Sequence, residues 1–474
     1  MLLQMYAIMQ KKKKGGACVK KRRHWHLPRL FLVLTLIVFV SVDLPALLGV
    51  RLPYVRPSEK YSDENTTDVP QAAPSQVEET SQSEQDPSAQ VRHTVTPMAL
   101  VSYTGTDPVV CMPGKEALQT DEVLSLLYEK MEIEACRVSN EKGENGYPAG
   151  SVRLTGEKVE SGQIGLCLSQ VSADHPEFFW LSRKYSYHYE GNDTIIQLYS
   201  YISGSECETL SHQLQQKINS LMDQIPPDSS ELQREKYLYD WIANNCQYDQ
   251  TGETAEENWR AYSLVGCLLD GEAVCEGYAR TLQLLLNQTG ILCRCITGTA
   301  GDGGHMWNMA KIEGEWVHVD LTWDDTSSPV LLYRYFNVSD EKITQTHTPS
   351  GDFTALSQEE RRKNRALLNA PMPACTEESL TYYPNFALSF SEKEEENLTA
   401  AMVQAMATKE RTVALYIPPE LSYEHAVQRI FYDDGNIFTE CVAQANRQGA
   451  GISYSDCVYY CMEEERGIVI VLQS

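Results

Sequence analysis

Hydrophobic and polar positions divide the chain into regions of different character. An apolar run, Leu30–Val42, is interrupted by Asp43 and extended by Leu44–Val50. Residues 51–97 are rich in Ser, Gln, Glu, Thr and Pro and nearly devoid of large apolar residues. Such a stretch buries too little surface to fold, so we predict a disordered linker there. Folded sequence is expected from Met98 onward.

Residues 98–225 mix helix and strand patterns, which predicts an N-terminal α+β region. Glu122–Glu132 has helical periodicity, whereas Ser151–Leu154, Ile164–Leu168 and Thr194–Ser203 resemble strands. An aromatic cluster is interpreted as core or domain-contact surface, with a sugar- or peptide-binding shelf as the alternative. The cluster consists of Phe178, Phe179, Trp180, Tyr185, Tyr187 and Tyr189.

Two predicted helices precede the segment that carries the chemistry. The first has apolar residues at steps of four and three, and it ends at Pro226 and Pro227. For the second, Asp228 and Glu231 have the spacing of a capping box. The apolar stripe of the first helix is Leu210, Leu214, Ile218, Leu221 and Ile225.

The last hundred residues are expected to form a separate small α/β domain. Thr412–Ile417 resembles a strand, and Tyr423–Asn446 is largely helical in pattern. Val458–Met462 and Gly467–Leu472 resemble a β-hairpin. Since this segment contains no chemical motif, we expect it to have a binding or packing role.

Charge is distributed unevenly along the chain. Residues 1–50 carry nine Lys and Arg and one acid, whereas the rest carries 31 bases and 64 acids. An acidic body excludes nucleic acid as a partner, because phosphate contacts need clustered Lys and Arg. The basic block keeps residues 1–29 in the cytoplasm by the positive-inside rule. We therefore expect a transmembrane signal anchor at residues 30–50 and an extracytoplasmic body, with secretion after cleavage as the alternative.

The fourteen cysteines include no Cys-x-x-Cys pair, which removes support for zinc-ribbon and thioredoxin motifs. Cys275 stands apart because Gly271–Asn287 predicts a small-residue turn leading into a helix, with this cysteine in the first turn. Unpaired backbone N–H groups and the positive end of the helix dipole lie there, and both stabilise a thiolate. Cys275 is therefore a candidate nucleophile, and the same N–H groups are candidate donors to an oxyanion.

A hairpin follows, with two strands around a turn at Glu313–Gly314. In the register of a two-residue loop, His305 and Asp320 become diagonal neighbours on one face, about 7–8 Å apart at the backbone. A one-residue change in the loop would replace Asp320 by Asp325 on that face. From pattern alone, a Cys-His-Asp triad and a structural cysteine beside incidental polar residues both remain open.

Three sequence blocks resemble those of the bacterial transglutaminase-like superfamily. They are CEGYA at Cys275–Ala279, GHMWNMA at Gly304–Ala310 and HVDLTWDD at His318–Asp325. Their order and spacing also match, and the resemblance covers roughly residues 230–340. It implies an α+β fold with a papain-like core, in which a helix packs on an antiparallel sheet. Met306 departs from the family, in which alanine is common.

The resemblance also implies catalytic roles: Cys275 as nucleophile, His305 as base and Asp320 as the group that orients the base. The implied reaction is acyl transfer through a thioester on peptide or protein amide bonds. Hydrolysis is preferred to cross-linking, because water is abundant outside a cell. Cell-surface proteins or cell-wall peptides are the expected substrates, and no cofactor or metal is expected. The alternative function is a non-catalytic cell-surface binding or structural module that retains the fold.

These expectations divide the chain into six parts. They are a basic cytoplasmic segment (1–29), a signal anchor (30–50), a linker (51–97), an N-terminal α+β region (98–225), a transglutaminase-like core (226–370) and a C-terminal α/β domain (371–474).

Overall fold

The computed structural model describes residues 93–99, 103, 106–301, 303–325, 330–349, 372–408, 412–454 and 457–472. Within these ranges, none of the helices has both the length and the apolar character that a bilayer crossing requires. The predicted anchor at residues 30–50 and the basic segment before it lie outside the described residues. Ordered structure begins before Met98, because β1 (His93–Thr94) pairs with β2 (Arg137–Val138).

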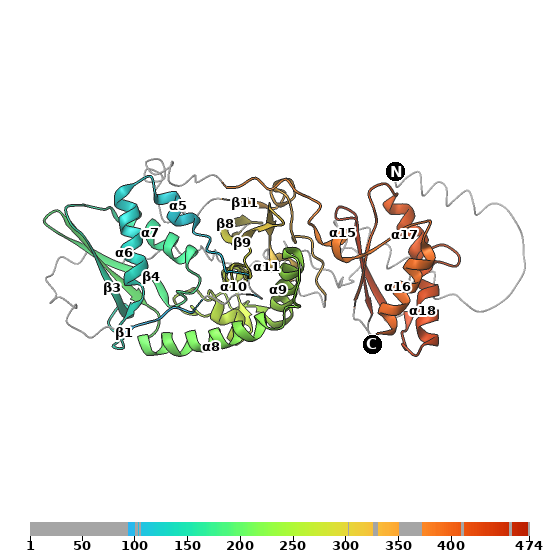
Figure 1. The fold of residues 1–474 in the computed structure, drawn as a ribbon, viewed down its shortest axis with the longest axis horizontal. Coiled ribbons are helices and arrows are strands. Elements are labelled where there is room, and N and C mark those ends of the chain that lie inside the picture. The colour runs from blue at the N-terminus through green and yellow to red at the C-terminus, as the bar shows by residue number, and fades with distance from the viewer. Residues whose placement is uncertain are drawn as a thin grey trace, which may run out of the picture. The chain divides into compact units, whose positions relative to one another are not determined.

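A three-stranded antiparallel sheet with strand order β3-β5-β4 forms the first part of the fold (Figure 1). The predicted strand at Ile164–Leu168 is wrong, because these residues lie inside a helix, α7. A short apolar run fits a buried helix as well as a strand, and here Glu160 and Gln163 form the capping box that starts the helix. The elements are α5 (Pro113–Leu118), α6 (Glu122–Glu134), β3 (Tyr147–Leu154), α7 (Ser161–Asp174), β4 (Leu181–Glu190) and β5 (Asp193–Ser200).

Two helices lead from this sheet to the core, α8 (Gly204–Met222) and α9 (Glu231–Asn245). The capping box of α9 is formed by Ser230 and Gln233. The predicted pair, Asp228 and Glu231, is therefore wrong by two residues. The φ angle of Asp228 is +65°, so its backbone lies outside the helical region.

The core contains α10 (Cys275–Gln288) packed on a four-stranded antiparallel sheet of order β10-β9-β8-β11 (Figure 1). The predicted hairpin register is confirmed, because Ile312 pairs with Glu315. The second strand ends earlier than predicted, at Val319, and a short helix begins at Leu321. The remaining elements are β6 (Gln247–Tyr248), the π-helix η3 (Gly266–Asp270), β7 (Glu272–Ala273), β8 (Cys293–Ala300), β9 (Gly303–Ile312), β10 (Glu315–Val319), α11 (Leu321–Asp324), α12 (Asp340–Ile343) and β11 (His347–Pro349).

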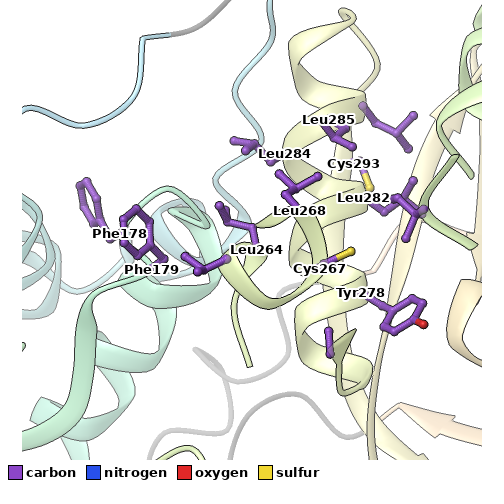
Figure 2. Close-up of a cluster of buried hydrophobic side chains, with 14 of the residues drawn as sticks. Phe178, Phe179, Leu264, Cys267, Leu268, Tyr278, Leu282, Leu284, Leu285 and Cys293 are labelled. Carbon is purple, nitrogen blue, oxygen red and sulfur yellow. The ribbon is translucent and has the colours of Figure 1, made fainter. Parts of the chain in front are cut away.

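Helix α10 is buried on nearly every side, which explains its apolar sequence. Tyr278, Leu282 and Leu285 line one side of it, at the spacing of one helical stripe (Figure 2). Phe178 and Phe179, which precede β4, belong to the same cluster of buried side chains. The core helix is thus held both by its own sheet and by the N-terminal part of the fold.

The C-terminal part contains a second four-stranded sheet, of order β12-β13-β15-β14. The predicted strand and hairpin are present, but the predicted helix over Tyr423–Asn446 is divided in two. The chain turns between the two helices, because Gly435 has a φ of +74° and Asn436 caps the second helix. The elements are α15 (Tyr382–Phe386), β12 (Leu388–Ser389), α16 (Glu395–Ala407), β13 (Thr412–Tyr416), α17 (Tyr423–Phe431), α18 (Ile437–Arg447), β14 (Cys457–Met462) and β15 (Gly467–Leu472).

Candidate active site

Cys275 is the first residue of α10, directly after the extended residue Val274. Its side chain is only partly buried, unlike most cysteines of the core. Gly277 brings the preceding loop against this end of the helix, because a Cβ there would lie 2.4 Å from the carbonyl oxygen of Ala261. The backbone N–H of Val274 donates to that same carbonyl at 3.0 Å. The backbone is therefore held against the preceding loop both before Cys275, at Val274, and after it, at Gly277.

His305 lies on β9, opposite Gly298 of β8. Asn308, three residues further on, donates from Nδ2 to the carbonyl oxygen of Ala279 at 2.9 Å. This bond joins β9 to α10 through a buried amide, so the strand that carries the histidine is held against the helix that carries the cysteine. Trp307 and Asn308, the last two residues of the His-Met-Trp-Asn run, thus have structural roles, because Trp307 is also buried.

Asp320 follows β10 and is the N-cap of α11. Its Oδ1 accepts the backbone N–H of Trp323 at 3.1 Å, and its Oδ2 lies 2.7 Å from Nε2 of His305. The predicted pairing of these two residues is confirmed as a contact. The route differs from the predicted one, because the carboxylate reaches the ring from a helix cap and not from a continued strand.

His305 also makes a hydrogen bond with the side chain of Cys275. Since Nε2 is engaged by Asp320, Nδ1 is the ring nitrogen left for the sulfur. Burial by itself lowers the pKa of His305, but the charge and hydrogen bond of Asp320, together with Cys275, outweigh it and raise the pKa to about 10. The ring therefore carries a proton at neutral pH. A positive neighbour of this kind favours the nucleophilic form of a cysteine.

A second histidine, which the sequence did not identify, shares this carboxylate. Nε2 of His347 lies 2.8 Å from Oδ2 of Asp320, and its Nδ1 lies 2.8 Å from the hydroxyl of Thr346. His347 is 1% exposed and is surrounded by aromatic rings, among them Trp323 at 4.6 Å between centroids. It reaches the site because β11 pairs with β8 at the edge of the sheet.

The neighbouring acids have other partners. Asp324 accepts from the hydroxyl of Tyr239 at 2.5 Å, and Asp325 accepts from the hydroxyl of Tyr278. Burial raises the pKa of Asp324 to about 7 despite its hydrogen bonds. His318 contacts Asp340, with 2.9 Å between Nε2 and Oδ1. Asp324 and Asp325 connect α11 with other helices, and His318 connects β10 with α12. Of the acids in this segment, Asp320 is the one that bonds to His305.

Within the part of the chain that the structure describes, two groups of side chains have the donors that a transition metal prefers. In the first, His305, Asp320 and His347 each offer a ligand atom, and these atoms lie within 4.8 Å of one another. His318, Asp340 and Cys375 form the second. In the first group, Nε2 of His305 and Nε2 of His347 both lie at hydrogen-bond distance from Oδ2 of Asp320. Hydrogen bonds therefore already join these three side chains.

Residues 219–321 match the model of the transglutaminase-like superfamily. The matched segment contains all three predicted site residues. Together with the antiparallel sheet under α10, it shows that the predicted fold class, α+β with a papain-like core, is correct. No curated protein matches the chain.

Solved structures similar to the chain share little sequence with it. A structure described as "a TGase" is 16% identical, with a TM-score of 0.22, over 40% of this chain and 55% of its own length. A "putative protease" from Parabacteroides distasonis is 12% identical, with a TM-score of 0.19, over 28% and 35%. A "putative cysteine protease" from Cytophaga hutchinsonii is 14% identical, with a TM-score of 0.20, over 39% and 70%. The chain thus spans about half the length of the first of these structures.

Proposed function

We propose that the chain is a cysteine acyl-transfer enzyme of the transglutaminase-like type that acts on amide bonds of peptides or proteins. One observation carries the proposal: Nε2 of His305 lies 2.7 Å from Oδ2 of Asp320, and the same ring interacts with the side chain of Cys275. A partly exposed sulfur, a buried imidazole and a buried carboxylate are the parts of a nucleophile, base and orienter.

The first half of the reaction forms a thioester. The sulfur of Cys275 attacks the amide carbonyl carbon, and a C–S bond forms as the carbonyl π electrons move to oxygen. Backbone N–H groups in the first turn of α10 are the donors for that oxyanion. The oxyanion collapses, the C–N bond breaks, and the leaving amine takes a proton from His305. Asp320 holds the ring in the required orientation throughout.

The second half resolves the thioester with water or with a second amine. His305 accepts a proton from the attacking group, the C–S bond breaks, and the sulfur is regenerated. Water gives a peptidase or amidase, and a lysine amine gives a cross-linked product. We prefer hydrolysis, because water is far more concentrated than any competing amine and the sequence indicates no amine-binding pocket. Cell-surface proteins and cell-wall peptides are the proposed substrates.

We also propose that residues 30–50 anchor the protein in the membrane, with the body outside the cell. The basic block followed by an apolar run of nearly bilayer length supports this orientation. Fractionation of cells expressing the full chain should recover it with the membranes, and external protease should digest it in intact cells. Recovery in the medium would instead indicate a cleaved signal, and recovery in the cytosol would contradict both.

Thiol labelling tests the catalytic proposal directly. At mildly acidic pH, iodoacetamide should modify Cys275 of the folded full-length protein well before the other cysteines, as read by peptide mass spectrometry. Cys111 and Cys136 are internal controls, because both are partly exposed while burial raises the pKa of each thiol to about 11. His305→Ala should slow the modification of Cys275 at that pH.

Equal labelling of Cys275 and the two control cysteines, unaffected by His305→Ala, would contradict the proposal and favour a non-catalytic binding module. Where labelling succeeds, incubation with a peptide and a lysine analogue distinguishes the two outcomes of the thioester. Free carboxylic acid as the main product supports hydrolysis, whereas an isopeptide product supports cross-linking.

A further inference from the structure

A cavity lies beside the start of α10, between the core and the N-terminal part of the fold. The space between its lining residues is about 360 Å³, which includes solvent at its opening. Glu276, the residue after Cys275, lines it together with Tyr262. Because Glu276 follows Cys275 in the first turn of α10, the cavity borders the start of the helix that carries the candidate nucleophile.

Three parallel aromatic rings form one wall of this cavity. Trp259 lies between Phe179 and Tyr201, with centroid distances of 6.2 and 6.1 Å and interplanar angles of 17° and 7°. Phe179 precedes β4 and Tyr201 follows β5, so this wall comes largely from the N-terminal part of the fold. Flat apolar faces of this kind suit the side chain or backbone of a bound peptide.

The charged groups of the cavity are two arginines and one glutamate. Glu276 is 4% exposed, and its carboxylate pairs with Arg280 at 2.9 Å and with Arg183. Among the residues that line the cavity, positive charge thus exceeds negative charge by one. This local excess contrasts with the chain as a whole, which has a formal net charge of −25.

We propose that this cavity binds a carboxylate of the peptide substrate close to the amide bond that Cys275 attacks. The inference rests on the proposed function and assigns it a substrate class, peptides with a carboxylate beside an apolar group. Either an acidic side chain or a free C-terminus supplies that chemistry. Arginine is suited to it, because its planar fork matches the two oxygens of a carboxylate.

The two arginines have different roles. Arg280 also contacts the backbone carbonyl and the hydroxyl of Ser172, so its guanidinium is fixed by the protein on several sides. Arg183 lies over the ring of Tyr262 at 5.4 Å, and its side chain is 17% exposed against 11% for Arg280. Both arginines pair with Glu276, but Arg183 is the more exposed of the two, so we assign contact with the substrate carboxylate to Arg183 and positioning of Glu276 to Arg280.

Arg183 lies on β4, outside the segment that matches the transglutaminase-like superfamily. Selectivity thus comes from the N-terminal part of the fold, whereas the reacting groups come from the core. The aromatic residue Phe179, beside the cavity, belongs to the cluster for which the sequence left both a core role and a peptide-binding role open.

The test uses the full chain and a matched peptide series. Each position flanking the cleaved bond carries Glu, Gln or Lys in turn, and each peptide is made with a free and with an amidated C-terminus. We expect kcat/KM to favour the carboxylate over its neutral isostere about tenfold or more, because one hydrogen bond to a charged group is worth that much. Preference for Glu indicates a side chain, and preference for the free acid indicates a C-terminus.

Arg183→Gln should abolish the preference, so that kcat/KM for the carboxylate peptides falls to the value that the same variant shows for their neutral isosteres. Arg153→Gln is the matched control, because it removes an arginine that is half exposed on β3, and it should keep the preference. Equal cleavage of acidic and neutral peptides by the wild-type protein overturns the inference even where Arg183→Gln does not fold. A preference that survives in folded Arg183→Gln also overturns it. Failure of the proposed function differs from both, since then no peptide is cleaved and Cys275 is not selectively labelled.

Discussion

The imidazole of His347 is bonded to the carboxylate of Asp320, with 2.8 Å between Nε2 and Oδ2. The same oxygen is also hydrogen-bonded to His305. The other oxygen, Oδ1, accepts the backbone N–H of Trp323 and so caps α11. Burial raises the pKa of the Asp320 carboxyl, but the two histidines outweigh it and hold that pKa well below its usual range. The buried negative charge is thus stabilised from three directions, and His347 supplies one of them.

His347→Gln should therefore move the acid limb of the pH–rate profile to higher pH. Removing the imidazole leaves the Asp320 carboxylate with less stabilisation, so its pKa rises and the orienting charge is lost at a higher pH. We expect a fall in kcat of about tenfold near the acid limb and a smaller fall at neutral pH. Peptide hydrolysis measured across the pH range checks this.

His318→Gln is the matched control for that experiment. His318 is equally buried and lies on the same sheet, but its partners are Asp340 and Trp307. Its replacement should leave the acid limb in place. A profile that is unchanged in His347→Gln, with the protein still folded, would show that the second histidine has a purely structural role.

Asp320→Asn should reduce turnover by roughly 10² to 10⁴ and leave most of the fold intact. An amide has the same shape as the carboxylate, but it cannot accept from His305 and His347 and also cap α11 without placing its NH₂ group against a donor. The ring of His305 then loses its orientation and its charged partner. Measuring kcat together with thermal unfolding separates lost chemistry from lost structure. Full activity in the variant would contradict the proposed role of the carboxylate.

The sequence predicted much of this site because it lies in local patterns. The first turn of α10 fixes Cys275, and the hairpin register places β10 beside β9, so that Asp320, which follows β10 as the N-cap of α11, lies near His305. His347 was missed, because it reaches the carboxylate through β11, whose pairing with β8 joins distant parts of the chain. A lone histidine in a polar segment has no spacing that indicates such a partner. Helix α7 was missed because short apolar runs do not distinguish helix from strand.

Gly277→Ala should destabilise the protein even though alanine is the better helix former. The added Cβ would lie 2.4 Å from the carbonyl oxygen of Ala261 and 2.8 Å from Cβ of Ala273, so the loop or the helix must move. We expect a loss of about 1–3 kcal/mol from this crowding and a marked fall in activity, because Cys275 begins the same helix. Urea unfolding measures the first. Gly303→Ala is the control, because a Cβ at that position meets open space.

Glu235→Gln should stabilise the protein at alkaline pH and have little effect in acid. Burial raises the pKa of the Glu235 carboxyl to about 8, although Asn337 donates to it at 2.7 Å. The folded state therefore holds a proton that the unfolded state releases near pH 4.5, and the stability of the wild-type protein falls as the pH rises from that value towards about 8. Glutamine cannot ionise, so this loss disappears. We expect a difference on the order of a few kcal/mol at pH 9, measured by urea unfolding at pH 5 and pH 9. Glu129→Gln, on the exposed face of α6, should show no such dependence, and equal curves for wild type and Glu235→Gln at both pH values would show that Glu235 is ionised in the fold.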